Sequence, residues 1–393
     1  MTTNTVHILS ARRTPIGAML GTFSPVAAPL LGAAALRAAL AGAGVEPVAI
    51  DEVVMGCVLP AGQGQAPARQ AALAAGIPAS VPATTVNKMC GSGMRAVMFA
   101  ADQLAAGGAG LVLAGGMESM TNAPYLLQKA RAGYRMGHGE IFDHMFYDGL
   151  QSPWDGKLMG CFADATAASY GFTRGDQDAY AAESVRRALA AIESGAFDAE
   201  IAPVTVADRK GERIVARDET PFNVSIDKIP GLKPAFAKDG TVTAASSSSI
   251  ADGAAALLLA RPDTAARLGL KSMAKLVAHA SHAQAPEWFT TAPVAAIAKV
   301  LEKAGWRTTD VDLFEINEAF AVVTMAAIKD LAIAPDRVNV HGGACALGHP
   351  IGATGARILA TLLHALVRSG GRRGVASLCI GGGEATAVAV ELI

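Results

Sequence analysis

Two stretches of the chain repeat one order of elements, and this repeat limits the possible folds more than any other feature. From Gly93 onward apolar residues recur at helical spacing until a Gly-Gly pair at 107–108, and LVLAGG at 111–116 predicts a buried strand. GATGARILATLLHALVRSGG at 352–371 predicts a helix with the same glycine boundaries, and VASLCIGGG at 375–383 predicts another short strand.

The repeat keeps nearly the same spacing at two distant anchor points. Gly93 aligns with Gly355 at an offset of 262 residues, and Asp51 of DEVVMG aligns with Asp312 of DLFEIN at an offset of 261. In each half, strands alternate with helices, which is typical of parallel crossover units whose sheet is covered on both faces. The sequence therefore predicts a duplicated α/β protein.

The segment between the repeats differs in composition. Residues 121–246 hold 13 of the 20 aromatic residues, including all five tyrosines. A connection of this length predicts an inserted subdomain with its own small core, able to form one wall of a ligand site. We expect an N-terminal half over 1–120, the insert over 121–246, completion of the N-terminal half over 247–270 and a C-terminal half over 271–393.

Charge and cysteine content narrow the functional classes. The net charge is −1, so there is no basic footprint for nucleic acid or for a membrane surface. The amino terminus lacks a continuous apolar segment, and we expect a soluble, cytoplasmic protein. An odd number of widely spaced cysteines argues against a disulfide framework and in favour of reactive thiols: Cys57, Cys90, Cys161, Cys345 and Cys379.

Cys90 lies in NKMCGSGM, directly before the first predicted helix of the repeat. The free N–H groups and positive dipole end of a helix stabilise a thiolate, so we expect the pKa of Cys90 to be lowered. The neighbouring glycines allow a substrate to approach closely. A buried, inert cysteine is the structural alternative.

His349 is the candidate base for this thiol. It lies in GGACALGHPIGATG, a glycine-rich turn before the repeated helix, where it could face Cys90 across the pseudo-symmetric arrangement. A purely structural histidine is the alternative. Cys345 and His349 have a C-x3-H spacing, but no second ligand pair follows, and we expect no metal site.

Two further polar or reactive groups interrupt apolar segments. Cys379 ends a predicted strand and is followed by three glycines, whose backbone N–H groups can form an oxyanion hole or simply a tight turn. Asn317 of EINEAFA lies in an apolar strand-to-helix passage and needs a partner, either as a helix cap or through a bound water. All these groups lie at junctions where doubly wound folds assemble their sites.

At these residues the chain resembles the thiolase family. The resemblance extends from RTPIG at 13–17 to CIGGGEATA at 379–387 and includes NKMCGSGM, NEAFA and GGACALGHPIGATGAR in the same order. It implies a thiolase fold of duplicated βαβαβαββ halves in a layered αβαβα core, with two sheets packed through central helices and an inserted loop subdomain. It also implies a dimer or, more specifically, a homotetramer.

The resemblance implies a role for each catalytic candidate. Cys90 would be acylated by a thioester after His349 removes its proton, and Cys379 would take a proton from the α-carbon of a second acetyl-CoA. A water on Asn317 together with His349 would meet the enolate oxygen, and the N–H groups of Cys90 and Gly381 the acyl oxyanion. No metal or redox cofactor is expected, since coenzyme A thioesters are substrates.

Substrate residues are carried over by motif position. The family places the pantetheine arm between the insert and the core, which implies a mainly apolar lining by Leu158, Met159, Phe236, Ala244, Ser248, Ala319 and Phe320. Leu158 stands where biosynthetic relatives often have histidine.

These implications favour acetyl-CoA acetyltransferase activity, with CoA, acetyl-CoA and acyl-CoA as small-molecule partners. The main alternative is a 3-ketoacyl-CoA thiolase of broader chain length, acting in fatty-acid or aromatic breakdown. A decarboxylating ketoacyl synthase and a non-catalytic carrier of acyl-CoA or lipid are weaker alternatives.

Overall fold

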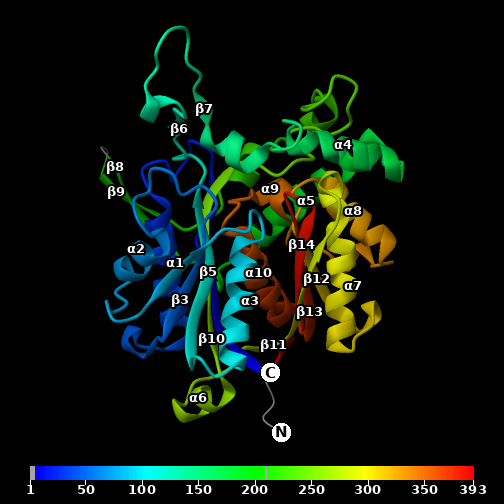
Figure 1. The fold of residues 1–393 in the computed structure, drawn as a ribbon. Helices are drawn as coiled ribbons and strands as arrows, with labels where there is room; N and C mark the ends of the chain where they lie inside the picture. The colour runs from blue at the N-terminus through cyan, green and yellow to red at the C-terminus, as the bar shows by residue number, and fades with distance from the viewer. Residues whose placement is uncertain (1–4, 209–210) are drawn as a thin grey trace.

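The computed structural model describes residues 5–208 and 211–393. Its main feature is one hydrogen-bonded sheet in the order β12-β13-β14-β11-β1-β10-β5-β3-β4, with β2 paired to β10. Figure 1 shows outer helices on both sides of the molecule and a central pair of helices, α3 and α10, between the two halves of the sheet. Among the described residues, no helix is both long and apolar enough to cross a membrane.

The N-terminal half follows the predicted βαβαβαββ order. Its elements are β1 (Val6–Arg13), α1 (Ala28–Ala43), β3 (Glu52–Gly56), α2 (Pro67–Ala74), β4 (Ala83–Val86), α3 (Ser92–Ala105), β5 (Leu111–Ser119) and β10 (Ala251–Ala260), with the short β2 (Gly17–Ala18) after β1. The strand β5 is buried along its whole length. The helices α1 and α2 pack their apolar side chains on the outer face of this half-sheet.

The C-terminal half repeats this order with one strand fewer. Its elements are β11 (Ala274–Ala283), α7 (Ala292–Ala304), β12 (Leu313–Ile316), α8 (Ala321–Asp330), α9 (Ala344–Leu347), α10 (Thr354–Ser369), β13 (Arg373–Ile380) and β14 (Glu384–Leu392). The helix α7 covers the outer face of this half-sheet.

A single parallel bridge between Phe314 and Val338 stands where the N-terminal half has β4. The reason lies in Asn339, whose φ of 48° ends the extended backbone there. Its side-chain Oδ1 accepts the Ile316 N–H at 2.8 Å and its Nδ2 donates to the Ile316 carbonyl at 2.8 Å. The amide side chain therefore replaces the missing ladder bonds.

The two half-sheets are continuous, although the resemblance implied two packed sheets. Residues Val6, His7 and Ile8 of β1 pair antiparallel with Leu276, Lys275 and Ala274 of β11. Between the half-sheets lie α3 and α10, whose apolar faces form one core cluster with β1, β5, β10, β13 and β14. The layers are therefore αβαβα, as expected, and the pairing of β1 with β11 joins the two half-sheets.

Equivalent hydrogen bonds in the two halves confirm the duplication. Asp51 Oδ2 accepts the N–H groups that begin β5, at 2.7 Å from Gly110 and 2.9 Å from Leu111. Asp312 Oδ2 accepts the N–H groups of Arg372 and Arg373 at the start of β13, at 2.7 and 2.8 Å. The offset of 261 residues between Asp51 and Asp312 is thus the spacing between pseudo-symmetric positions.

The other anchor pair of the repeat lies where the central helices cross. A Cβ on Gly355 would lie 2.4 Å from the Met94 backbone nitrogen, and a Cβ on Gly93 would lie 2.9 Å from the Ala356 nitrogen. Only residues without a side chain allow this approach, which draws together the starts of α3 and α10 and the loops before them.

Gly355→Ala is therefore expected to destabilise the protein by about 2 to 3 kcal/mol, because backbone atoms on both helices would have to move. The free energy of unfolding in urea measures the effect. The matched control is Gly175→Ala, an exposed position in the helix Arg174–Glu193 where a Cβ has its nearest neighbour at 3.7 Å. This control should be stabilised by up to about 1 kcal/mol, and equal effects of both changes would contradict the prediction.

The insert lies across one end of the layered core (Figure 1). Its elements are β6 (Tyr125–Leu126), β7 (Phe142–Asp143), a π-helical turn (Met145–Leu150), α4 (Met159–Tyr170), α5 (Arg174–Glu193), β8 (Val204–Asp208) and β9 (Gly211–Val215). The short helix α6 (Pro262–Arg267) then joins β10 to the C-terminal half. The boundaries between the four expected segments stay predictions.

Candidate active site

Cys90 lies in a tight turn between β4 and α3. Met89 has a φ of 47°, an unfavourable value for a residue with a side chain. Ser92 stabilises the turn, since its Oγ accepts the Lys88 N–H at 2.8 Å and donates to the Met89 carbonyl at 2.6 Å. An ion pair between Lys88 and Glu384 connects this turn to the C-terminal half.

The pKa of Cys90 is raised to about 11, so the expected lowering was wrong. Burial is the main cause, and it outweighs the N–H of Gly381 that hydrogen-bonds the sulfur and lowers the pKa. The helix begins only at Ser92. The N–H groups of Gly91 and Ser92 bond the carbonyls of Lys88 and Met89, so they do not stabilise a thiolate.

His349 is buried and hydrogen-bonded through one ring nitrogen only. Its Nδ1 lies 2.6 Å from Thr354 Oγ1, and its Nε2 has no partner among the described residues. Burial first, and then the positive charge of Arg357, lowers the pKa of His349 to about 3. The imidazole is therefore neutral at physiological pH, with one nitrogen free for chemistry.

Cys379 and Gly381 lie where β13 ends and the glycine turn begins. Burial raises the pKa of Cys379 well above its usual value, and the negative charge of a Cys90 thiolate raises it further. The charge interaction between the two sulfurs and the hydrogen bond from Gly381 to the Cys90 sulfur show that these two candidate loops lie together. Gly382 and Gly383, with φ of 97° and 88°, turn the chain back into β14.

Asn317 follows β12 at the same end of the sheet. Its backbone N–H donates to the Ser377 carbonyl at 3.0 Å, so the residue is held against β13. Both polar atoms of its side chain are buried and lack a partner within the described chain. Such a group requires a water or a ligand, which agrees with the second of the two interpretations of this amide. The first was wrong, since Phe320 is the residue that precedes α8.

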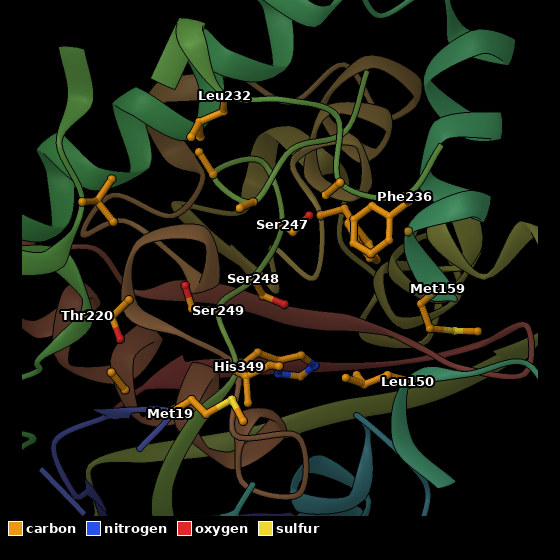
Figure 2. A pocket seen from close by; sticks show the side chains of 18 of the residues that line it. Met19, Leu150, Met159, Thr220, Leu232, Phe236, Ser247, Ser248, Ser249 and His349 are labelled. Atoms are coloured by element: carbon orange, nitrogen blue, oxygen red, sulfur yellow. The ribbon is translucent and has the colours of Figure 1, made fainter. Parts of the chain in front are cut away.

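A cavity of about 770 Å³ opens between the insert and the core, beside these groups. Six of the seven predicted substrate residues line it: Leu158, Met159, Phe236, Ala244, Ser248 and Phe320. Ala319 is not among the lining residues and instead accepts the Ser248 N–H through its carbonyl at 3.0 Å. Figure 2 shows the His349 ring and the side chains of Met159, Phe236 and Ser248 directed into one space.

The two thiols lie behind the walls of this cavity. Cys90 packs in an apolar cluster with Met120 and Ile351, and both of these residues line the cavity. Cys379 packs in a cluster with Phe320, Met159 and Phe236, which also line the cavity. His349 lines the cavity, and neither Cys90 nor Cys379 is among its lining residues.

Cys345, the residue that could have formed a metal site together with His349, contacts a different part of the chain. Its Sγ lies 3.7 Å from the Glu318 carbonyl oxygen, and it is buried. Within residues 5–208 and 211–393 there is no group of three or more His, Cys, Asp or Glu side chains that could hold a metal ion.

Comparison with known proteins agrees with this arrangement. Residues 6–263 match the sequence profile described as "Thiolase, N-terminal domain", and residues 270–392 match "Thiolase, C-terminal domain". The chain belongs to the thiolase family.

Similar thiolases cover almost the whole chain. An acetyl-CoA acetyltransferase of Chromobacterium violaceum is 48% identical over 98% of this chain and 99% of its own length. Acetyl-CoA acetyltransferase 2 of Arabidopsis thaliana is 50% identical over 99% and 97%. A probable acetyl-CoA acyltransferase of Staphylococcus aureus is 46% identical over 98% of both chains.

A solved thiolase structure has the same fold. The crystal structure of the Bacillus anthracis acetyl-CoA acetyltransferase matches with a TM-score of 0.97 and 42% sequence identity, over 99% of both chains.

Sequence reasoning missed one buried group of this thiolase site, Glu118. Its carboxylate accepts the N–H groups of Val58 at 2.9 Å and Leu59 at 3.2 Å, in the cluster that contains Cys90, and of Gly352 at 2.9 Å, near His349. It therefore connects the loops of both halves. An acidic residue within an otherwise apolar buried strand was the signal that could have indicated it.

Glu118 should make the stability of the protein depend on pH. Burial raises the pKa of Glu118 to about 7, above its usual value of 4.5, so the folded protein binds the proton more tightly than the unfolded chain. Stability relative to Glu118→Gln should fall as pH rises from 4.5 to about 7, by about 3 kcal/mol in total. Urea unfolding of both proteins across this range measures the difference, and parallel curves would contradict it.

Proposed function

We propose that this thiolase is an acetyl-CoA acetyltransferase, which condenses two acetyl-CoA reversibly to acetoacetyl-CoA and CoA through an acetyl-cysteine. The observation that carries the proposal is the pairing of Cys90 with the Cys379–Gly381 turn, beside the free Nε2 of His349 and the unpartnered Asn317. The names of the similar proteins support the choice of substrate.

In the first half-reaction, His349 Nε2 takes the thiol proton of Cys90. With a pKa of about 11, the thiol has little thiolate at neutral pH, so a base is needed. The sulfur attacks the thioester carbonyl carbon, and the N–H groups of Cys90 and Gly381 stabilise the oxyanion. Collapse breaks the carbon–sulfur bond to CoA, which leaves as a thiol with the proton from His349.

In the second half-reaction, Cys379 takes a proton from the α-carbon of a second acetyl-CoA. Its own proton first passes to the bare Nε2 of His349, and the Cys90 thiolate takes this proton back when the bond to the acetyl group breaks. His349 and a water on Asn317 stabilise the enolate oxygen. The enolate carbon then attacks the acetyl carbonyl, the bond to Cys90 breaks, and acetoacetyl-CoA leaves.

The chemistry we propose uses no metal and no redox cofactor. Thiols and an imidazole supply the proton transfers, and backbone N–H groups with a bound water supply the charge stabilisation. Coenzyme A and its thioesters are substrates, and the 770 Å³ cavity is the proposed site for the pantetheine arm and acyl group. We further propose a cytoplasmic dimer or tetramer acting in fatty-acid metabolism.

A 3-ketoacyl-CoA thiolase of broader chain length is the second candidate. The mostly apolar lining, which includes Leu158, favours it, as does the acyltransferase name of the Staphylococcus aureus relative. Met159 favours the short-chain assignment, since its sulfur would lie 3.7 Å from a methyl group placed at Gly381 and so limits the space beside the reacting atoms.

Thiolysis of acetoacetyl-CoA and of 3-ketooctanoyl-CoA with free CoA separates these candidates. We expect a kcat/KM at least about 10-fold higher for the four-carbon substrate, since the eight-carbon acyl chain has several more methylenes that the site would have to accommodate. Efficient cleavage of the eight-carbon substrate would assign the enzyme to the broader class with the same mechanism. Met159→Ala should shift the preference toward the longer substrate if this side chain sets the limit.

A further inference from the structure

We propose that Thr354 is a positioning residue that holds His349 in the tautomer with the proton on Nδ1, so that Nε2 is free to accept the proton of Cys90. The inference deepens the proposed function and rests on it for the role of the proton. The tautomer itself rests on the hydrogen bonds alone.

The assignment follows from the single proton of the Thr354 hydroxyl. Thr354 Oγ1 donates to the carbonyl of Pro350 at 2.9 Å, an acceptor that carries no hydrogen. The same oxygen lies 2.6 Å from His349 Nδ1, so both contacts can be hydrogen bonds at once only if the oxygen accepts there. Nδ1 then carries the hydrogen, and a neutral imidazole has no second one for Nε2.

The backbone holds this geometry in place. The backbone N–H of His349 donates to the Ser249 carbonyl at 2.9 Å, which fixes the backbone position from which the imidazole extends. Thr354 lies in the first turn of α10, next to Gly355, whose close contact with Met94 locks the helix start. These contacts fix the backbone positions of both residues, which keeps the ring nitrogen and the hydroxyl within hydrogen-bonding distance.

The chemical consequence is that Nε2 can first take the thiol proton of Cys90 and then donate the same proton in the next step. Burial and Arg357 keep the ring neutral, so its Nε2 is an acceptor toward Cys90 and not a donor. Once Nε2 has taken the thiol proton, it becomes a donor that can face a substrate oxygen or the leaving thiolate. The opposite tautomer would present an N–H to Cys90 and could not act as its base.

The experiment uses the full-length protein labelled with ¹⁵N-histidine and long-range ¹H–¹⁵N correlation spectra. Comparison with His349→Asn assigns the His349 signals. In wild type and in Thr354→Ser we expect a protonated Nδ1 and a bare Nε2. In Thr354→Val, which keeps the shape but loses the acceptor, we expect Nε2 protonation to become populated and the rate of Cys90 acetylation to fall roughly 10- to 100-fold.

Thr166→Val is the matched control. Thr166 is also buried in a helix and donates to the carbonyl four residues earlier, Phe162, at 3.0 Å. It should leave both the tautomer and the acetylation rate unchanged. Loss of activity in both valine variants would assign the effect to folding and overturn the positioning role, as would wild-type rates in Thr354→Val.

The wild-type spectrum tests the tautomer even if the valine variant fails to fold. A protonated Nε2 in wild type would mean that the hydroxyl donates to Nδ1, and it would overturn the proposal. A bare Nε2 in a protein that transfers no acetyl group would leave the tautomer standing and reject the proposed function.

Discussion

Cys90→Ser is expected to lower acetoacetyl-CoA thiolysis by at least about 10⁴-fold with little change in stability. Serine is close to cysteine in size, so the turn held by Ser92 should survive. A hydroxyl is a far weaker nucleophile than a thiol, and His349, with its pKa lowered to about 3, is too weak a base to compensate. The rate is followed by the disappearance of acetoacetyl-CoA.

Mass spectrometry of the intact protein and its peptides after incubation with acetyl-CoA gives a second readout. Wild type should carry one acetyl group on Cys90, and Cys90→Ser none. Cys161→Ser is the control, because that half-buried thiol, whose Sγ lies 3.9 Å from the Phe236 carbonyl oxygen, has no role in the proposed mechanism. Activity surviving in Cys90→Ser would overturn the mechanism, and a native Cys90 that neither acetylates nor reacts with iodoacetamide would favour a carrier.

Cys379→Ala is expected to separate the two half-reactions. In the proposed mechanism, acetylation of Cys90 requires only Cys90, His349 and the N–H groups of the turn, so exchange of label between CoA and acetyl-CoA should continue. Condensation should fall about 10³- to 10⁴-fold, since the enolate then forms without its base. Exchange and condensation are measured on the same preparation.

Two outcomes would contradict this assignment. If Cys379→Ala lost exchange and condensation equally, Cys379 would be needed for acetylation and the separation of roles would be wrong. If the wild-type protein released carbon dioxide from malonyl-CoA during condensation, the enolate would arise by decarboxylation. The enzyme would then belong with the ketoacyl synthases.

Local sequence patterns were enough to find most of the site. Cys90, His349 and Cys379 each stand next to glycines where a strand or turn meets a helix or another turn, and such junctions are readable without an alignment. Asn317 was recognisable as an amide in an apolar passage. The two Gly-Ala-Arg and Gly-Met-Arg helix starts indicated the duplication because the glycines are needed where the helices cross.

The properties of these groups could not be predicted in the same way. The pKa of Cys90 depends on burial and on the Gly381 N–H, which belongs to the other half of the chain. Glu118 received no role because its partners, Val58, Leu59 and Gly352, come together only when both halves fold. The strand missing from the C-terminal half coincides with the left-handed backbone of Asn339; asparagine tolerates this conformation, but the residue type alone does not show that a strand is lost there.

The sequence by itself thus determined the duplicated α/β order, the thiolase family resemblance and the reactive residues, because each depends on periodicity or on residue types close together in the chain. Tertiary structure alone decided that burial raises the pKa of Cys90, which nitrogen of His349 is free and which residues line the cavity. The pKa of Cys90 and the cavity lining depend on segments more than a hundred residues apart that exclude solvent and supply hydrogen bonds. The free nitrogen of His349 depends on a contact with Thr354, five residues away, that forms only when the turn before α10 folds.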